Sequence, residues 1–302
     1  MSLNSVHTNI GAQIALQSLN NTTTALQAAQ KRVSTGFRVA DAADDGGAYA
    51  VAERVRSDVG ALQTVNGQLG NAKGLVSTAL SSLTSISSSL TTAKSLLVQI
   101  GDNSITQSQR DQYVATYKAV VVQVANTVDG STYNGQTLVG KASGAVAGTD
   151  KSIINNEVGA QSTLHNADNS GLANTLATLI GSTFTRTSAG ADTFGAITSG
   201  ADQTSAITAL SATTGSTAFV TAQTGLANQL NQTGADSRFI DAPISLNSSK
   251  IDSLNAGLGA LVDTDLAKES ANLQALQIRQ QLGTQSLSIA NQAPQSLLSL
   301  FK

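Results

Sequence analysis

The strongest hydrophobic pattern in the chain is a heptad repeat between residues 62 and 100. Two registers, three residues apart, are filled by Leu, Val, Ile or Ala through six heptads. The first register holds Leu62, Leu69, Val76, Leu83, Leu90 and Leu97, and the second holds Val65, Ala72, Ala79, Ile86, Ala93 and Ile100. A seven-residue apolar repeat is typical of long helices that pack along a seam. It predicts one helix from about 48 to 100, roughly 80 Å long at 1.5 Å per residue.

The outward positions of this predicted helix are Ser, Thr, Gln and Asn rather than Glu and Lys. A coiled coil in water normally carries charged residues beside its seam, because these select the partner helix. We therefore expect the helix to bury more than one face.

Both ends of the chain are helical in pattern, apolar and almost uncharged. Residues 1–40 contain no Asp or Glu, and residues 262–302 carry few charges after Glu269. Apolar helices that cannot cover themselves should be sticky, and they make sense if identical neighbours cover them. The apolar positions that we assign to polymerisation lie on the terminal helices and on the heptad helix: Leu19, Leu26, Val33, Leu62, Leu69, Val76, Leu83, Leu90, Leu273, Leu276, Leu282, Ile289, Leu297 and Leu300.

The middle of the chain is less regular. A second helix is predicted from about 105 to 128, and hairpins and loops from 131 to about 175. Of the 44 residues in 181–224, 18 are Ser or Thr, which indicates a solvated surface segment or, as a sharper alternative, an O-glycosylated one. Helical pattern returns at about 217, and Pro243 is expected to interrupt it.

Composition excludes several classes of function. Lys plus Arg is 17 and Asp plus Glu is 19, so the formal charge is 17 − 19 = −2, which argues against a nucleic-acid or polybasic membrane surface. There is no Cys, so disulfides and thiolate chemistry are impossible. We expect no cleavable secretory signal and no membrane span, because no apolar run is long enough.

No catalytic, cofactor-binding or metal-ligating set stands out. The motifs HExxH, GxxxxGK[ST] and GxSxG are absent. Asp44-Asp45-Gly46 and Asp263-Thr264-Asp265 could suggest cation binding, but carboxylates at the first turn of a helix explain both. His7 is expected to be an ordinary polar position, and His165 lies in a predicted loop without an evident partner.

Several short motifs lie near the two ends of the chain. The N-terminal motifs include His7-Thr8-Asn9, Ser18-Leu19-Asn20, Ser34-Thr35-Gly36-Phe37-Arg38 and Ala43-Asp44-Asp45. The C-terminal motifs include Val262-Asp263-Thr264-Asp265 with Glu269, and Ala290-Asn291-Gln292-Ala293-Pro294-Gln295. Together, in this order and at these distances from the ends, they are specific. The chain resembles bacterial flagellin, of the short type found in alphaproteobacteria, over about 1–140 and 217–302.

The resemblance implies a mainly α fold, with long helices in an antiparallel coiled-coil bundle, paired terminal helices and a small β-hairpin and loop region in the middle. It implies three regions. Residues 1–44 with 257–302 would form an inner terminal-helix domain, and 45–170 with 215–256 a rod-like helical domain. Residues 171–214 would form a variable Ser/Thr/Gly-rich surface segment.

The implied function is structural. The chain would be a subunit of the extracellular flagellar filament, exported unfolded and polymerising through its terminal helices into a tube that works as the motility propeller. Implied partners are identical or related flagellins, the export apparatus, a secretion chaperone and the filament cap, with no nucleic acid, membrane, cofactor or small-molecule ligand. The nearest alternative is a hook–filament junction protein. A secreted helical effector or adhesin, and an enzyme with a peptidase insert, are further alternatives.

Overall fold

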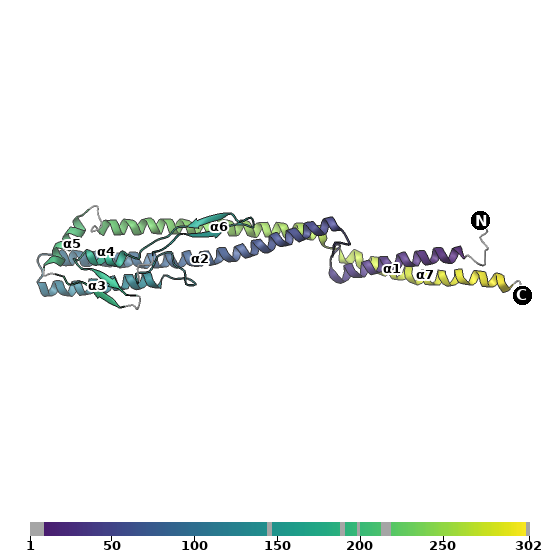
Figure 1. Ribbon diagram of the computed structural model, residues 1–302, viewed down its shortest axis with the longest axis horizontal. Coiled ribbons are helices and arrows are strands. Elements are labelled where there is room, and N and C mark those ends of the chain that lie inside the picture. Colours follow the sequence, from purple (N-terminus) through teal and green to yellow (C-terminus); the bar gives the residue numbers. More distant parts are fainter. Residues whose placement is uncertain (1–8, 144–146, 188–190, 198–199, 213–218, 300–302) are drawn as a thin grey trace. The chain divides into compact units, whose positions relative to one another are not determined.

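The computed structural model describes residues 9–143, 147–187, 191–197, 200–212 and 219–299, with side chains as far as residue 292. Within these ranges the chain forms seven helices and four short strands (Figure 1). The helices are α1 (Ile10–Thr35), α2 (Gly46–Gly101), α3 (Gln107–Gly130), α4 (Leu172–Thr178), α5 (Ala201–Ser211), α6 (Phe219–Val262) and α7 (Leu266–Ser299). The strands are β1 (Lys151–Ile154), β2 (Gln161–Leu164), β3 (Phe184–Arg186) and β4 (Asp192–Phe194). The predicted mainly α fold with a small β region is confirmed.

The chain divides into two compact units. Unit 1 is made of Met1–Gly60 and Ile251–Lys302, and unit 2 of Ala61–Lys250. Helices α2 and α6 contribute to both units, and each unit has its own buried clusters.

The heptad helix is the spine of unit 2. Helix α2 begins at Gly46 and ends at Gly101, close to the predicted bounds. All twelve positions of the two predicted registers are buried, with Leu62, Leu69 and Leu83 fully inaccessible to solvent. They belong, apart from Leu62, to one core cluster that draws side chains from α2, α3, α4, α5 and α6. The expectation that this helix buries more than one face is consistent with that cluster.

Helix α3 has the strongest N-terminal signal in the chain. Thr106 and Gln109 form a capping box, in which each side chain bonds to the other's backbone N–H. Further along the helix, Tyr117 is fully buried and its hydroxyl donates to the Leu176 carbonyl at 2.9 Å. Burial in this apolar surrounding raises the pKa of the Tyr117 phenol. This bond fastens α4 to α3.

Two antiparallel hairpins lie between α3 and α6. Strand β1 pairs with β2, with Lys151 opposite Leu164, and β3 pairs with β4, with Phe184 opposite Phe194. Arg186 on β3 has a side chain only 4% exposed and forms ion pairs with Asp192 at 2.5 Å and Asp129 at 3.0 Å. The segment 181–224, expected to be solvated, is buried in part, because four of its apolar residues join the core: Phe184, Ala206, Ala209 and Phe219. The residues just before it also join the core: Leu172, Ala173, Leu176, Ala177, Leu179 and Ile180.

The predicted interruption at Pro243 is also wrong. Helix α6 runs through Pro243 without a break. A proline inside a helix removes one backbone donor, so the Phe239 carbonyl loses its partner four residues on. Residue 239 is exposed, so water can satisfy that carbonyl, while the buried Ile240 and Asn247 hold the helix to the core of unit 2.

Unit 1 consists of a pair of long helices, two linkers and the adjoining ends of α2 and α6. Helices α1 and α7 lie side by side along their length (Figure 1). The side chain of Asn9 caps α1 by accepting from the Ala12 N–H at 3.0 Å. Gly36 ends the helix with a φ of 76°, a left-handed conformation that glycine adopts without steric cost.

Candidate assembly surface

The seam between α1 and α7 is narrow. Its buried cluster consists of Leu26 and Ala29 from α1 and Leu276 from α7, with Leu273 packed beside them. Nearer the N-terminus of α1, Leu19 packs against Gly283 of α7. A Cβ added at Gly283 would stand 3.2 Å from Leu19 Cδ1. Small residues therefore let the two helices approach closely. At the end of the seam, the Asn9 amide donates to the Ala290 carbonyl at 2.7 Å.

Outside this seam, large aliphatic side chains face solvent on both helices. Away from the junction end, the α1 residues are Ile10, Ile14 and Leu16, and the α7 residues are Ile278, Leu282 and Ile289, each between 41% and 63% exposed. Ile10 and Ile14 share one side of α1 and Leu16 lies on another. We call the six residues together the aliphatic face. Neither helix carries compensating charge beside it, since α1 has no charged residue before Lys31 and α7 has only Arg279 after Glu269. A folded chain in water rarely leaves such a surface open, because each apolar Å² removed from water contributes about 25 cal/mol.

The linker from α1 to α2 is bonded to the linker from α6 to α7. The backbone N–H groups of Arg38 and Val39 both donate to the Val262 carbonyl, at 2.7 and 3.3 Å. The Arg38 guanidinium donates to the Leu261 carbonyl at 2.5 Å. The Thr264 N–H donates back to the Gly36 carbonyl at 3.0 Å. Both linkers are thus held in one defined shape.

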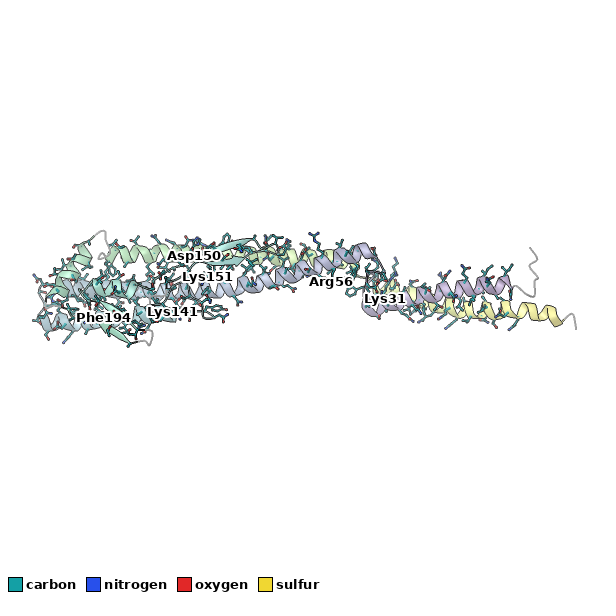
Figure 2. The ribbon with its side chains drawn as sticks, in the orientation of Figure 1. Lys31, Arg56, Lys141, Asp150, Lys151 and Phe194 are labelled. Atoms are coloured by element: carbon teal, nitrogen blue, oxygen red, sulfur yellow. The ribbon has the colours of Figure 1, made fainter. Side chains whose placement is uncertain are left out.

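Charged residues of the family motifs complete this junction. Lys31, which is labelled in Figure 2, contacts Asp41 at 2.6 Å and Asp44 at 2.8 Å. The hydrogen bonds from Lys31 lower the pKa values of Asp41 and Asp44 below the ordinary range of a carboxyl. The same two bonds raise the pKa of Lys31. Across the seam, Arg32 lies 3.5 Å from the largely buried Glu269.

The two acidic turns noted in the sequence begin helices. Asp45 accepts from the N–H groups of Gly47 and Ala48 at 3.0 Å each, at the start of α2. Asp265 accepts from two N–H groups at the start of α7 in the same way. Asp263 pairs with Phe37 in an isolated bridge between the linkers. The carboxylates therefore shape helix starts, as the sequence predicts.

The structure separates the residues assigned to polymerisation into different groups. Five of them, on α2, are buried inside the chain's own core: Leu62, Leu69, Val76, Leu83 and Leu90. Four lie along the α1–α7 seam: Leu19, Leu26, Leu273 and Leu276. Val33 is half-buried near the end of α1. Leu282 and Ile289 belong to the aliphatic face, and Leu297 and Leu300 lie outside the described side chains.

Sequence reasoning missed four residues of the aliphatic face, Ile10, Ile14, Leu16 and Ile278. Their signal is a spacing of four residues, which Ile10 shares with Ile14 and Ile278 with Leu282, off the heptad register. The strongest heptads mark the chain's own core instead.

The remaining motif residues have smaller structural roles. Asn20 is exposed, and its carbonyl accepts from Thr24 at 3.1 Å. Asn291 and Gln292 are exposed on α7, and Gln292 lies 3.4 Å from Ser288 Oγ. The Pro294 side chain and the whole of His7 lie outside the described residues.

His165 does have a partner, contrary to expectation. Its backbone N–H donates to Asp236 Oδ2 at 2.8 Å, and its Nδ1 lies 3.1 Å from Asp236 Oδ1. Gln232 approaches the same ring nitrogen at 3.0 Å. The contact joins the loop after β2 to α6, so it serves the packing of unit 2.

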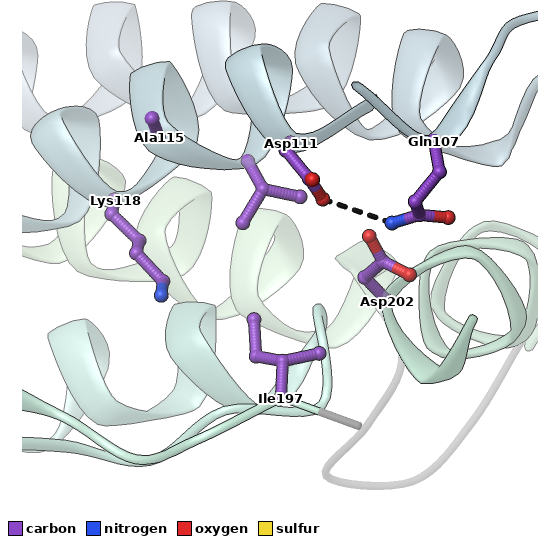
Figure 3. Close-up of a pocket in the computed structure, with 7 residues that line it drawn as sticks. Gln107, Asp111, Ala115, Lys118, Ile197 and Asp202 are labelled. Atoms are coloured by element: carbon purple, nitrogen blue, oxygen red, sulfur yellow. Dashed lines mark hydrogen bonds between the residues drawn. The ribbon is translucent and has the colours of Figure 1, made fainter. Parts of the chain in front are cut away.

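The side of α3 offers a pocket of about 420 Å³. Asp111 and Asp202 face it at one end and Lys118 at the other (Figure 3). Asp111 accepts from Gln107 at 2.9 Å, and Asp202 accepts from the backbone N–H of Gln203 at 2.9 Å. Across the ranges that the structure describes, no three His, Asp or Glu side chains gather closely enough to hold a metal ion. Nor do the helices in those ranges include one with the length and apolarity to cross a membrane.

Comparison with known proteins decides the family. Residues 6–143 match the bacterial flagellin N-terminal helical region, and residues 217–301 match the bacterial flagellin C-terminal helical region. Flagellin FljK of Caulobacter vibrioides is 33% identical over 302 residues, covering 100% of both chains. The chain belongs to the bacterial flagellin family. The flagellin of Brucella melitensis is 33% identical over 304 residues, 99% of each chain, and flagellin C of Rhizobium meliloti is 30% identical over 330 residues, 99% of this chain and 100% of that one.

Membership of the family establishes the general function. This flagellin is a structural subunit of the bacterial flagellar filament, and its relatives are alphaproteobacterial. The family polymerises with other flagellin subunits, and its filament is extracellular. The resemblance inferred from the end motifs is confirmed.

Proposed function

We propose that this flagellin polymerises by covering the aliphatic face of α1 and α7 with the same helices of neighbouring subunits. One observation carries the proposal: six large aliphatic side chains stand in solvent on the stretches 10–30 of α1 and 270–292 of α7, in which Arg279 is the one charged residue. Repeated contacts between different surfaces of identical subunits extend without closing, which produces a helical tube. The tube would act as the motility propeller and would not be an enzyme.

Several finer features follow from this proposal. The inner domain would comprise 1–44 with 257–302, the rod-like domain 45–170 with 215–256, and the variable region 171–214. The subunit would be secreted unfolded through the flagellar export apparatus with a secretion chaperone, and would be inserted beneath the filament cap. The absence of Cys supports this route, because no disulfide has to be opened for export. No cofactor, metal, nucleic acid, membrane or small-molecule partner is needed.

The test is assembly of full-length protein with a charge placed on the aliphatic face. Purified subunits are seeded with filament fragments and imaged by negative-stain electron microscopy. Wild-type protein should form long tubes, and the double variant Leu282→Asp with Ile289→Asp should remain monomeric, since two carboxylates would be buried without partners. A matched control is Val158→Asp, which replaces an exposed aliphatic side chain in unit 2 with the same charge.

Circular dichroism and thermal unfolding of each monomer should be unchanged, because all three positions are exposed. Normal tubes from the double variant would refute the proposal. A wild-type subunit that caps seeds without elongating would favour the hook–filament junction protein, which no observation on this chain favours at present.

A further inference from the structure

Two Asn–Gly dipeptides occur in the chain, and the fold places them in opposite environments. Asn66–Gly67 lies inside helix α2, and Asn134–Gly135 forms the centre of a tight turn after α3. An asparagine followed by glycine reacts with its own backbone more readily than other asparagines, because glycine has no side chain to shield the next amide nitrogen. The two sites share this chemistry, so any difference between them comes from the structure.

The turn leaves Asn134 open to reaction. Asn134 has a φ of 49° and Gly135 a φ of 74°, and both residues are exposed. The turn is closed by two backbone hydrogen bonds of 2.9 Å between Tyr133 and Gln136. Neither the Asn134 side chain nor the Gly135 N–H has a hydrogen-bond partner among the residues that the structure describes. Local opening of such a turn breaks only those two bonds.

Asn66 is restrained by contrast. Its Oδ1 accepts from Asn247 at 3.1 Å, and its Nδ2 lies 3.4 Å from Ser248 Oγ. The helical backbone commits the Gly67 N–H to the helix and keeps it away from the Asn66 side chain. Reaction there requires opening of α2 beside the fully buried Leu62 and Leu69.

We propose that Asn134 is a site of spontaneous deamidation in the folded subunit and that Asn66 is protected. The deprotonated backbone nitrogen of Gly135 attacks Cγ of Asn134, and a new N–Cγ bond forms. The Cγ–Nδ2 bond breaks, and the nitrogen leaves as ammonia after taking up a proton. Water then opens the resulting succinimide at one of its two carbonyl carbons, which yields aspartate or isoaspartate.

The products alter a turn that rests on the central helix. The Tyr133 ring lies on the backbone of Gly74, where an added Cβ would stand 2.6 Å from the ring. Aspartate keeps the turn and changes the formal charge from −2 to −3, by −2 − 1. Isoaspartate adds a methylene to the backbone, so a two-residue turn can no longer make both bonds between Tyr133 and Gln136.

The experiment follows both sites in one sample. Folded full-length protein is incubated at mildly alkaline pH, digested at intervals and analysed by mass spectrometry with fragmentation that separates aspartate from isoaspartate. Asn134 should deamidate at least about tenfold faster than Asn66, because opening the turn costs far less than opening α2. In denaturant, the two rates should become comparable. The rate at Asn134 should rise with pH, since the attacking nitrogen must lose its proton.

A variant supplies the control. Asn134→Asp should retain the fold, because Asp also tolerates a positive φ. It should show from the start the acidic shift in isoelectric focusing that the wild type acquires, and should then shift no further on the same timescale. Equal rates at the two sites in folded protein would overturn the proposal. So would an unreactive Asn134 under conditions in which the unfolded chain reacts.

Discussion

Unit 1 and unit 2 are both built on apolar helical seams, and they use them differently. In unit 2, α2 is flanked by other helices and its heptad residues are buried. In unit 1, α1 and α7 share a narrow seam around Leu26, Ala29 and Leu276, and Ile14 and Ile289 are each 63% exposed. In unit 2, the apolar seam is covered by helices of the same chain. Unit 1 leaves its apolar surface for other molecules to cover.

A regular heptad pattern of apolar residues and a surface that binds other subunits are therefore separate properties of a helix. A seam filled by Leu at every heptad closes within the chain, because its helical partners are part of the same fold. A helix with fewer and smaller seam residues keeps large aliphatic side chains outside. The surface proposed to bind neighbouring subunits therefore lies on α1 and α7, the helices with the less regular heptad repeat.

The largest effect on this comparison is expected from Leu83→Ala. Leu83 is fully buried in unit 2, so truncation should lower the free energy of unfolding by about 3 kcal/mol through lost burial and a cavity. Urea denaturation of the monomer measures it. The counterpart in unit 1, Ile278→Ala, removes a side chain that is 57% exposed and should change monomer stability by less than about 0.5 kcal/mol. Equal losses would mean that the two units do not differ as described.

A second effect concerns the buried charge of unit 2. Arg186→Leu leaves Asp129 and Asp192 without their cation, and should cost about 2 kcal/mol, since the guanidinium is almost completely buried. Hydrogen exchange should show early loss of protection in β3 and β4. The matched control is Lys73→Leu, whose pair with Asp241 is half exposed on both sides and should be worth less than about 1 kcal/mol.

A third, smaller effect tests the linkers of unit 1. Gly36→Ala places a Cβ on a residue with a φ of 76° and should destabilise the end of α1 by about 1 kcal/mol. Gly257→Ala, within α6 and with open space around it, should instead stabilise by a similar amount. Hydrogen exchange of the α1 amides measures the effect of Gly36→Ala, and hydrogen exchange of the α6 amides measures the effect of Gly257→Ala. Identical effects of both substitutions would contradict the left-handed role of Gly36.

The smallest effect is pH dependence at the junction. Because the pKa values of Asp41 and Asp44 are lowered by Lys31, these carboxyls bind fewer protons in the folded state. Their contribution is complete above the ordinary pKa of 3.8 and is lost as pH falls through the lower folded-state values. Acid titration followed by hydrogen exchange should weaken the linkers of wild type, and Lys31→Met should flatten that response. A variant with an unchanged acid response would remove Lys31 from this role.

Much of the fold could be predicted from local pattern. The span of α2 and the helix starts at Asp45 and Asp265 depend on near neighbours in the sequence, and they were predicted. The packing of residues 172–209 was not, because Ala173, Ala206 and other small residues carry little periodic signal among Ser and Thr. The passage of α6 through Pro243 was missed as well, since tertiary packing outweighs one lost hydrogen bond.

The candidate surface shows the same division. The sequence alone is enough to predict that both ends are apolar, helical and nearly uncharged, because composition and spacing are local properties. It does not show which apolar residues are buried in the chain's own core. Leu62 and Leu83 belong to the core while Leu282 and Ile289 face solvent, and this difference comes from the packing of the helices, because burial depends on which other helix occupies each face.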